Sequence, residues 1–180
     1  MTGVLSSFDP RNDRLARDIR NQMARAFVNC LDPEDDLVPV NQVTDRLLSG
    51  HPENVYKDYV KDRLQRYLAA KLTITSQKIT DNFYRALVLW DNELFFETHE
   101  VLEALWKESG GTAKLILQAL IRAAGYYIHL GTGNLAGAEK MAARASPVLN
   151  KYRGEVPPFP GLDDLLGCLE RRESAPPKLL

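Results

Sequence analysis

The sequence predicts an all-α fold, an antiparallel helical bundle with an N-terminal helical extension. Apolar residues recur at helical spacing along most of the 180 residues. Capping residues, glycines and prolines separate these stretches, and short connections between helices favour antiparallel neighbours. The only β-leaning stretches, 38–40 and 72–75, are too short to found a sheet.

The sequence predicts that residues 1–75 form an N-terminal helical extension. Five arginines, from Arg11 to Arg25, lie in and just before its first helical stretch. The expected helices are 13–29, 42–48 and 53–71, with an acidic, proline-containing loop at 31–39.

The second half is better specified, and we expect residues 76–150 to form a helical bundle. Its expected helices are 76–90, 93–107, 112–130 and 135–146. Asp91 or Asn92 should cap the second of these and Asn134 the fourth, which Pro147 should end or kink. Residues 151–180 read as a linker followed by a short helix at 162–171.

Composition excludes several classes of function. Lys+Arg 23 against Asp+Glu 24 leaves a net charge of -1, so no global field attracts nucleic acid, and we expect no nucleic-acid partner. The two cysteines fit no metal or redox spacing. We see no signal peptide and no membrane span, and we expect a cytoplasmic protein without a membrane partner.

The helix at 93–107 is the place to look for function. Its buried stripe is set by residues within about 40° of one another on a helical wheel, Phe95, Leu102 and Trp106. His99 and Glu103 lie beside this stripe. The opposite side carries Glu97, Glu100 and Lys107. Because burying an imidazole and a carboxylate costs several kcal/mol unless they are paired or bound, we expect a site there.

The helix at 112–130 is apolar nearly all round, except for a polar stripe within about 60°. The stripe consists of Gln118, Arg122, Gly125 and His129. It is either the solvent-facing edge of the helix or a partner of the first cluster, with Arg122 neutralising a carboxylate and His129 approaching His99. The large apolar surface leads us to expect a homo-oligomer.

The segment Phe-Phe-Glu-Thr-His-Glu-Val-Leu-Glu-Ala-Leu-Trp, residues 95–106, and the later Gly-Asn-Leu-Ala-Gly-Ala, 133–138, resemble the small helical proteins called domain of unknown function 309. The resemblance covers about residues 80–150. It implies an all-α bundle and no established activity. It also implies a shared polar cluster, made of His99, Glu100, Glu103, Trp106, Gln118, His129 and Asn134.

Two kinds of chemistry fit these residues. His99 and Glu103, four residues apart on one helix, could ligate a divalent metal with His129 as a third ligand. Similarity to the His-Glu-x-x-His helix of zinc proteases would make Glu100 a general base, so the catalytic candidates are His99, Glu100 and Glu103. Alternatively, a metal-free pocket could bind a small anionic ligand. Its candidate binding residues are Trp106, Gln118, Arg122, Tyr126, His129 and Asn134.

These alternatives stay open in the sequence. The first functional hypothesis is a helical bundle whose His/Glu/Arg cluster binds a small ligand or metal ion, with hydrolysis as a candidate activity. The second is a non-enzymatic module for self-association or protein interaction, in which Glu103 pairs with Arg122 and the cluster only holds the fold together.

Overall fold

The structure is a computed structural model that describes residues 8–50 and 53–180. The described residues form eight α-helices and one 3-10 turn, with no strand, which confirms the predicted all-α class. The helices are α1 (Arg14–Val28), α2 (Val38–Gly50), α3 (Asn54–Ser76), α4 (Asn82–Asp91), α5 (Phe95–Glu108), α6 (Gly111–Gly131), α7 (Leu135–Lys151) and α8 (Leu162–Arg171), and the 3-10 turn is Arg153–Glu155.

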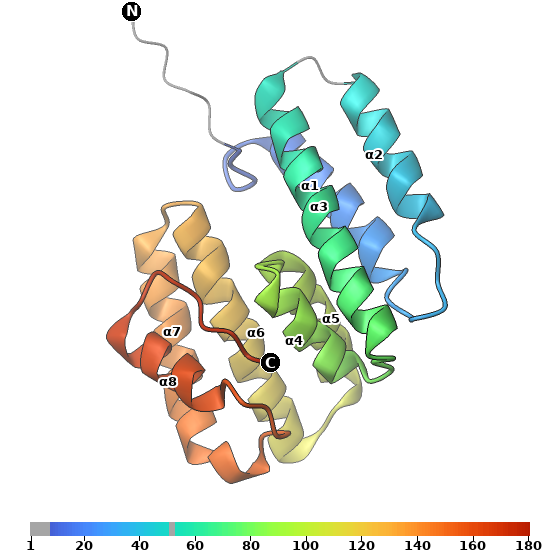
Figure 1. Cartoon of the computed structure of the whole chain (residues 1–180). Coiled ribbons are helices and arrows are strands. Elements are labelled where there is room, and N and C mark those ends of the chain that lie inside the picture. The colour runs from blue at the N-terminus through green and yellow to red at the C-terminus, as the bar shows by residue number, and fades with distance from the viewer. Residues whose placement is uncertain (1–7, 51–52) are drawn as a thin grey trace, which may run out of the picture.

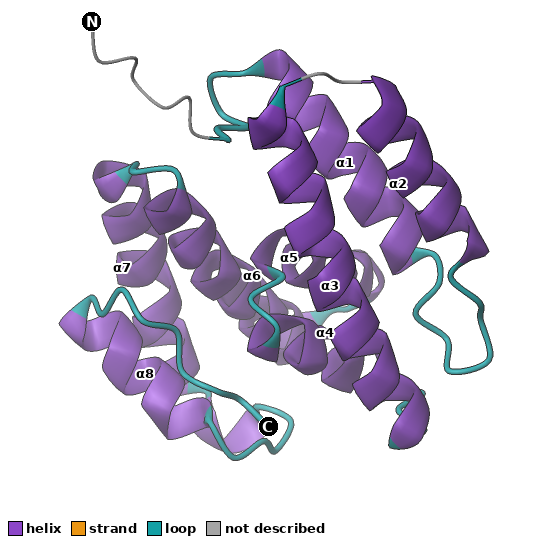
Figure 2. Cartoon of the chain, turned by 45° about the horizontal axis from the view of Figure 1, so that its top comes forward, coloured by secondary structure: helices purple, strands orange, loops and turns teal. Residues whose placement is uncertain are grey.

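The helices form three groups (Figure 1). Helices α1, α2 and α3 pack on one another, α6 and α7 form the longest hairpin, and α8 packs on α7. Helices α4 and α5 form the third group and lie between α1–α3 on one side and α6–α8 on the other, and Figure 2 shows the same order from a second direction. Helix α5 contacts α1, α4 and α6, so the predicted motif helix is enclosed from several sides.

Some helix ends follow the expected caps and others do not. Asp13 caps α1 by accepting the amide of Leu15 at 2.8 Å, and Asn134 caps α7 as predicted. The cap predicted at Asp91 or Asn92 is wrong, because α5 begins at Phe95 behind Leu94, which offers no capping side chain. Helix α7 continues through Pro147 to Lys151, beyond its predicted end.

Helix α3 runs through residues 72–75, which the sequence marked as β-leaning. Tyr67, Ala70 and Ile74 of this helix are fully buried in the core, at helical spacing. Packing of this apolar face therefore overrides the weak local preference of the β-branched residues.

Helix α6 is central. Its buried residues lie against α5 and α7, and the hydroxyl of Tyr126 donates to the backbone oxygen of Glu173 in the C-terminal segment at 3.1 Å. Most of the apolar surface that suggested a partner chain is thus covered within the chain, although Leu115 is 43% exposed and Ile121, Ile128 and Leu130 are only partly buried. Within the described residues, no helix is long and apolar enough to cross a membrane.

Candidate functional site

The motif helix α5 is turned differently from the prediction. Its buried residues are Glu97, Thr98, Val101 and Leu102, whereas Phe95 and Trp106 are only partly buried. The wheel assumed one buried face against the bundle, but α1 packs on a second face of α5, and two side chains of α3 reach Glu97. The expectation that Glu97 faces solvent is therefore wrong: this carboxylate has 0% of its surface exposed.

Glu97 is held by side chains of α3. The Tyr67 hydroxyl donates to Glu97 Oε1 at 2.6 Å, and the Arg63 guanidinium lies 3.9 Å from Glu97 Oε2. Arg63 Nε also donates to the Tyr59 hydroxyl at 3.0 Å. Glu97 Oε2 is fully buried and accepts no hydrogen bond from any described residue. One ion pair and one strong hydrogen bond thus offset the cost of burying this carboxylate.

The electrostatics of this network favour a neutral phenol and a charged guanidinium. Burial raises the pKa of Tyr67 well above its usual value, and the Glu97 carboxylate raises it further. Burial likewise raises the pKa of Tyr59 to about 12. Burial opposes the charge on Arg63, but Glu97, Tyr59 and Tyr67 together outweigh burial and the pKa of Arg63 rises. Tyr67 therefore remains a hydrogen-bond donor and Arg63 remains a cation at any physiological pH.

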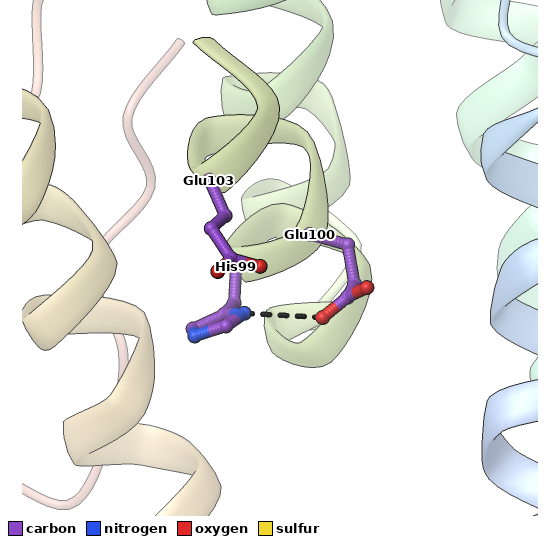
Figure 3. Close-up of side chains that lie close together, drawn as sticks. All are labelled: His99, Glu100 and Glu103. Atoms are coloured by element: carbon purple, nitrogen blue, oxygen red, sulfur yellow. Dashed lines mark hydrogen bonds and ion pairs between the residues drawn. The ribbon is translucent and has the colours of Figure 1, made fainter. Parts of the chain in front are cut away.

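The three catalytic candidates come together on one face of α5 (Figure 3). His99 Nδ1 lies 3.3 Å from Glu100 Oε1, and one ligand atom from each of His99, Glu100 and Glu103 lies within 4.8 Å of the others. Their side chains are 32%, 42% and 37% exposed. The hydrogen bond with His99 lowers the pKa of Glu100. The predicted burial of His99 with Glu103 is therefore wrong, and so is the prediction that Glu100 points away from His99.

The polar stripe of α6 does not face this cluster. Glu103 lies 3.5 Å from Lys107 Nζ instead of pairing with Arg122, and Arg122 forms no ion pair with any described residue. In this stripe Gly125 lies beside Met141 of α7, and Gln118 and Arg122 are partly buried. The stripe thus borders α7 at Gly125, and its residues are partly buried instead of forming the solvent-facing edge of the first alternative. The predicted pairing of Glu103 with Arg122 is wrong.

His129 lies in the last turn of α6 and is not part of the cluster of ligand atoms around His99. The amide of Asn134 donates from Nδ2 to His129 Nδ1 at 2.9 Å and accepts the Gly137 amide at 3.1 Å through Oδ1. A Cβ at Gly137 would collide with the Asn134 amide. The Gly-Asn-x-x-Gly motif therefore has a structural explanation, and the prediction that His129 is a third metal ligand beside His99 is wrong. Because Nδ1 accepts a hydrogen bond, the neutral ring carries its proton on Nε2.

The contacts of two further candidate binding residues, Tyr126 and Trp106, are explained by the packing of the fold. Tyr126 is 2% exposed and its hydroxyl is used by the Glu173 carbonyl, so it lies in the core. Trp106 is partly buried, and Lys114 Nζ lies 4.5 Å from the centre of its ring. Neither lines a cavity together with His99, as the metal-free hypothesis required.

A pocket that the sequence did not reveal lies where the N-terminal helices meet α5 and α6. Its volume is about 290 Å³. The walls carry five aromatic rings, Phe8, Tyr59, Phe95, Phe96 and Tyr127, and two guanidinium groups, Arg20 and Arg63. The remaining lining residues are Pro10, Ile128, Gly131 and Thr132. Apolar walls with a few charged groups are typical of small-molecule sites.

Both guanidinium groups of this pocket keep unused donors. Arg20 lies over the Phe96 ring at 3.9 Å and bonds Asn21 through Nε and Nη2. Arg63 uses Nε and Nη1 for Tyr59, Glu93 and Glu97. Arg20 Nη1 and Arg63 Nη2 have no hydrogen-bond partner among the described residues. Burial lowers the pKa of Arg20, so this guanidinium is partly stripped of water.

Sequence comparison finds a family profile that matches one part of the chain. Residues 83–141 match the profile of the family described as Domain of unknown function (DUF309), which confirms the resemblance seen in the motifs. The match covers about a third of the chain, from α4 into α7, and the family description states no activity. No curated protein and no solved structure shows significant similarity to this chain. Arg20, Tyr59 and Arg63 of the pocket lie outside the matched residues.

Proposed function

We propose that this protein binds a small organic anion in the pocket between α1, α3, α5 and α6. The observation that carries the proposal is the pair of guanidinium groups, Arg20 and Arg63, each with an unused donor at an aromatic-walled pocket of about 290 Å³. A partly dehydrated guanidinium is a strong partner for an anion, since its fork of donors matches a carboxylate.

The position of the pocket supports the same function. Its walls come from the N-terminal helices on one side and from the family segment on the other, and small-molecule sites occur preferentially at such junctions. Arg63 is fixed by Tyr59 and Glu97 before any ligand arrives. A guanidinium held in place loses little conformational entropy on binding.

Isothermal titration calorimetry with small organic carboxylates tests the proposal. The informative variant is Arg20→Gln, because this side chain bonds only its neighbour Asn21 and can be changed at little cost in stability. We expect Arg20→Gln to weaken binding at least tenfold, since a hydrogen bond between ions contributes about 1.5–3 kcal/mol. The matched control is Arg17→Gln on the same helix, which is exposed and does not line the pocket. Equal affinities in the two variants would refute an anion site at Arg20.

A second candidate function is binding of a divalent metal by His99, Glu100 and Glu103. It is favoured by the convergence of their ligand atoms within 4.8 Å on one helix face. Imidazole nitrogen and carboxylate oxygen are ligands that Zn²⁺ and Mn²⁺ accept. Glu100 and Glu103 also line a groove of about 550 Å³ between α1 and α5, which leaves room for water or a ligand on the ion.

Calorimetric titration of chelator-treated protein with Zn²⁺ tests this second candidate. We expect His99→Ala to weaken Zn²⁺ binding at least tenfold, since it removes the only nitrogen ligand of the cluster. Glu108→Gln, an exposed change on the same helix outside the cluster, should leave binding intact. Zn²⁺ binding that survives His99→Ala unchanged would place the ion elsewhere.

A further inference from the structure

The charges around the anion pocket set the charge of its ligand. Arg20 and Arg63 supply two positive charges, and Glu97 beside Arg63 supplies one negative charge with 0% exposure. Glu100 also acts on Arg20 electrostatically, but its side chain is 42% exposed and bonded to His99, so water screens it. The pocket therefore carries about one net positive charge, which a single negative charge balances. A dianion would bring an unpaired charge close to buried Glu97, which is costly.

The walls of the pocket set the shape of its ligand. Phe95 and Tyr127 stack with ring centres 5.1 Å apart and planes at 24°, and Phe8 and Tyr59 stack at 3.6 Å and 6°. Flat aromatic walls favour a flat ring, which gains stacking and edge-to-face contacts beyond its buried area. The volume of about 290 Å³ lies at the small end for ligand sites, so the ligand is compact.

The guanidinium donors of Arg20 and Arg63 determine which functional group the ligand carries. The guanidinium carbon of Arg20 lies 3.9 Å from the centre of the Phe96 ring, so its unused donor Nη1 is held beside an aromatic wall of the pocket. A carboxylate can accept one charge-assisted hydrogen bond from each of the two unused donors, Arg20 Nη1 and Arg63 Nη2. We propose that the ligand is an aromatic monocarboxylate with a single ring, whose carboxylate lies between Arg20 and Arg63 and whose ring lies among the aromatic walls. This identification rests on the function proposed above.

Calorimetric titration of the full chain with four probes separates the two proposals. Benzoate has the predicted charge and shape, cyclohexanecarboxylate keeps the charge without the flat ring, benzamide keeps the ring without the charge, and phthalate adds a second charge. We expect benzoate to bind at least tenfold more tightly than each of the other three. Arg20→Gln should remove the preference of benzoate over benzamide, and Arg17→Gln should preserve it.

Each outcome has one meaning. If cyclohexanecarboxylate or phthalate binds as tightly as benzoate, an anion site exists but the aromatic monocarboxylate is wrong. If benzamide equals benzoate, the pocket takes rings without using its guanidinium groups, and both proposals fail. If none of the four probes binds, both proposals fail as well. Displacement of benzoate by inorganic phosphate at equal concentration would also overturn the monocarboxylate.

Discussion

Glu97 is the residue on which the junction between the N-terminal helices and α5 depends. It lies in the sequence beside His99 and Glu100, yet it alone of the three carboxylates in the motif is removed from water. Two side chains of α3, Arg63 and Tyr67, have their charge or hydroxyl directed to it. A change at this position therefore acts on the packing of α3 against α5 and on the orientation of Arg63 at the pocket.

We predict that Glu97→Ala lowers the free energy of unfolding by about 3–5 kcal/mol, because it leaves a largely buried guanidinium without its partner. Tyr67→Phe, which removes one hydrogen bond to a charged group, should cost about 1.5–3 kcal/mol. Equilibrium urea denaturation measures both. The control is Glu100→Ala, whose carboxylate is 42% exposed, and which should change stability by less than about 1 kcal/mol. Equal losses for Glu97→Ala and Glu100→Ala would contradict the buried network.

Sequence reasoning located the motif helix but misassigned its carboxylates, for a specific reason. Periodicity reports which residues share a face, and Glu97, Thr98, Val101 and Leu102 share one. It does not report how many faces are covered, and α1 and α3 come from a stretch with no recognisable relation to the motif. The pocket was missed for the same reason, since Arg20 and Arg63 are brought to Phe96 only by tertiary packing.

At the scale of helices, the sequence predicted several helix ends correctly, and a capping side chain lies beside two of them. Asp13 and Asn134 each accept an amide from the first turn of the helix that follows, and α8 has the bounds the sequence predicted. The helix predicted at 76–90 instead begins at Asn82, behind the cap Asp81, because α3 continues to Ser76. Helix ends without such a side chain were misplaced, as at Leu94. Pro147 was read as an end of α7, but its missing amide is tolerated inside the helix because Ala145, Ser146 and Leu149 around it are buried.

The turn between α6 and α7 gives a prediction of pH dependence. Burial, aided by the charge of Arg11, lowers the pKa of His129 below its usual 6.5. Protonation of Nδ1 would also destroy the acceptor for Asn134 Nδ2, and a flipped amide would lose its bond to the Gly137 amide. The unfolded chain thus takes up this proton at a higher pH than the folded chain does. The stability contributed by neutral His129 is fully present above about pH 6.5 and is lost as the pH falls through the lowered pKa.

We therefore expect the melting temperature to fall between pH 7.5 and pH 5.5 by more in the parent protein than in His129→Gln. Scanning calorimetry at both pH values measures the difference. The glutamates with lowered pKa values, Glu100, Glu139 and Glu173, have a usual value of 4.5 and titrate below this window. A His129→Gln protein with an undiminished pH effect would show that another group is responsible.

At the scale of the whole molecule, residues 173–180 tie together helices that are distant in the sequence (Figure 1). The amides of Leu179 and Leu180 donate to the two carboxylate oxygens of Asp91 at 2.7 and 3.0 Å, and Trp90 Nε1 donates to the Pro177 carbonyl at 3.0 Å. Gly161 donates to the Leu179 carbonyl at 3.1 Å, and a Cβ at Gly161 would collide with the backbone of this segment. The C-terminal segment therefore joins α4 to the start of α8.

Leu179 anchors this segment, because its side chain is 1% exposed, whereas the neighbouring Leu180 is 46% exposed. We predict that Leu179→Ala costs about 2–5 kcal/mol, the usual range for a buried leucine truncated to alanine. Leu180→Ala has the same chemistry in a largely solvated setting and should cost less than about 0.5 kcal/mol. Urea denaturation followed by far-ultraviolet circular dichroism measures the difference between these two variants, and similar losses would mean that the segment is not anchored in the core.

Tryptophan fluorescence extends this test to cooperativity, since Trp90 bonds the segment directly. If the segment, α4 and α8 unfold with the rest of the molecule, the fluorescence and dichroism transitions of the parent protein coincide, as two-state unfolding requires. In Leu179→Ala the segment loses its anchor while Trp90 keeps its contacts with Phe95 and Tyr127 in the core. The midpoints of both transitions should then move together to lower urea concentration, because the C-terminal segment unfolds together with the core. An early fluorescence change in the variant, ahead of the loss of helix, would instead mark the segment as a separately melting strap.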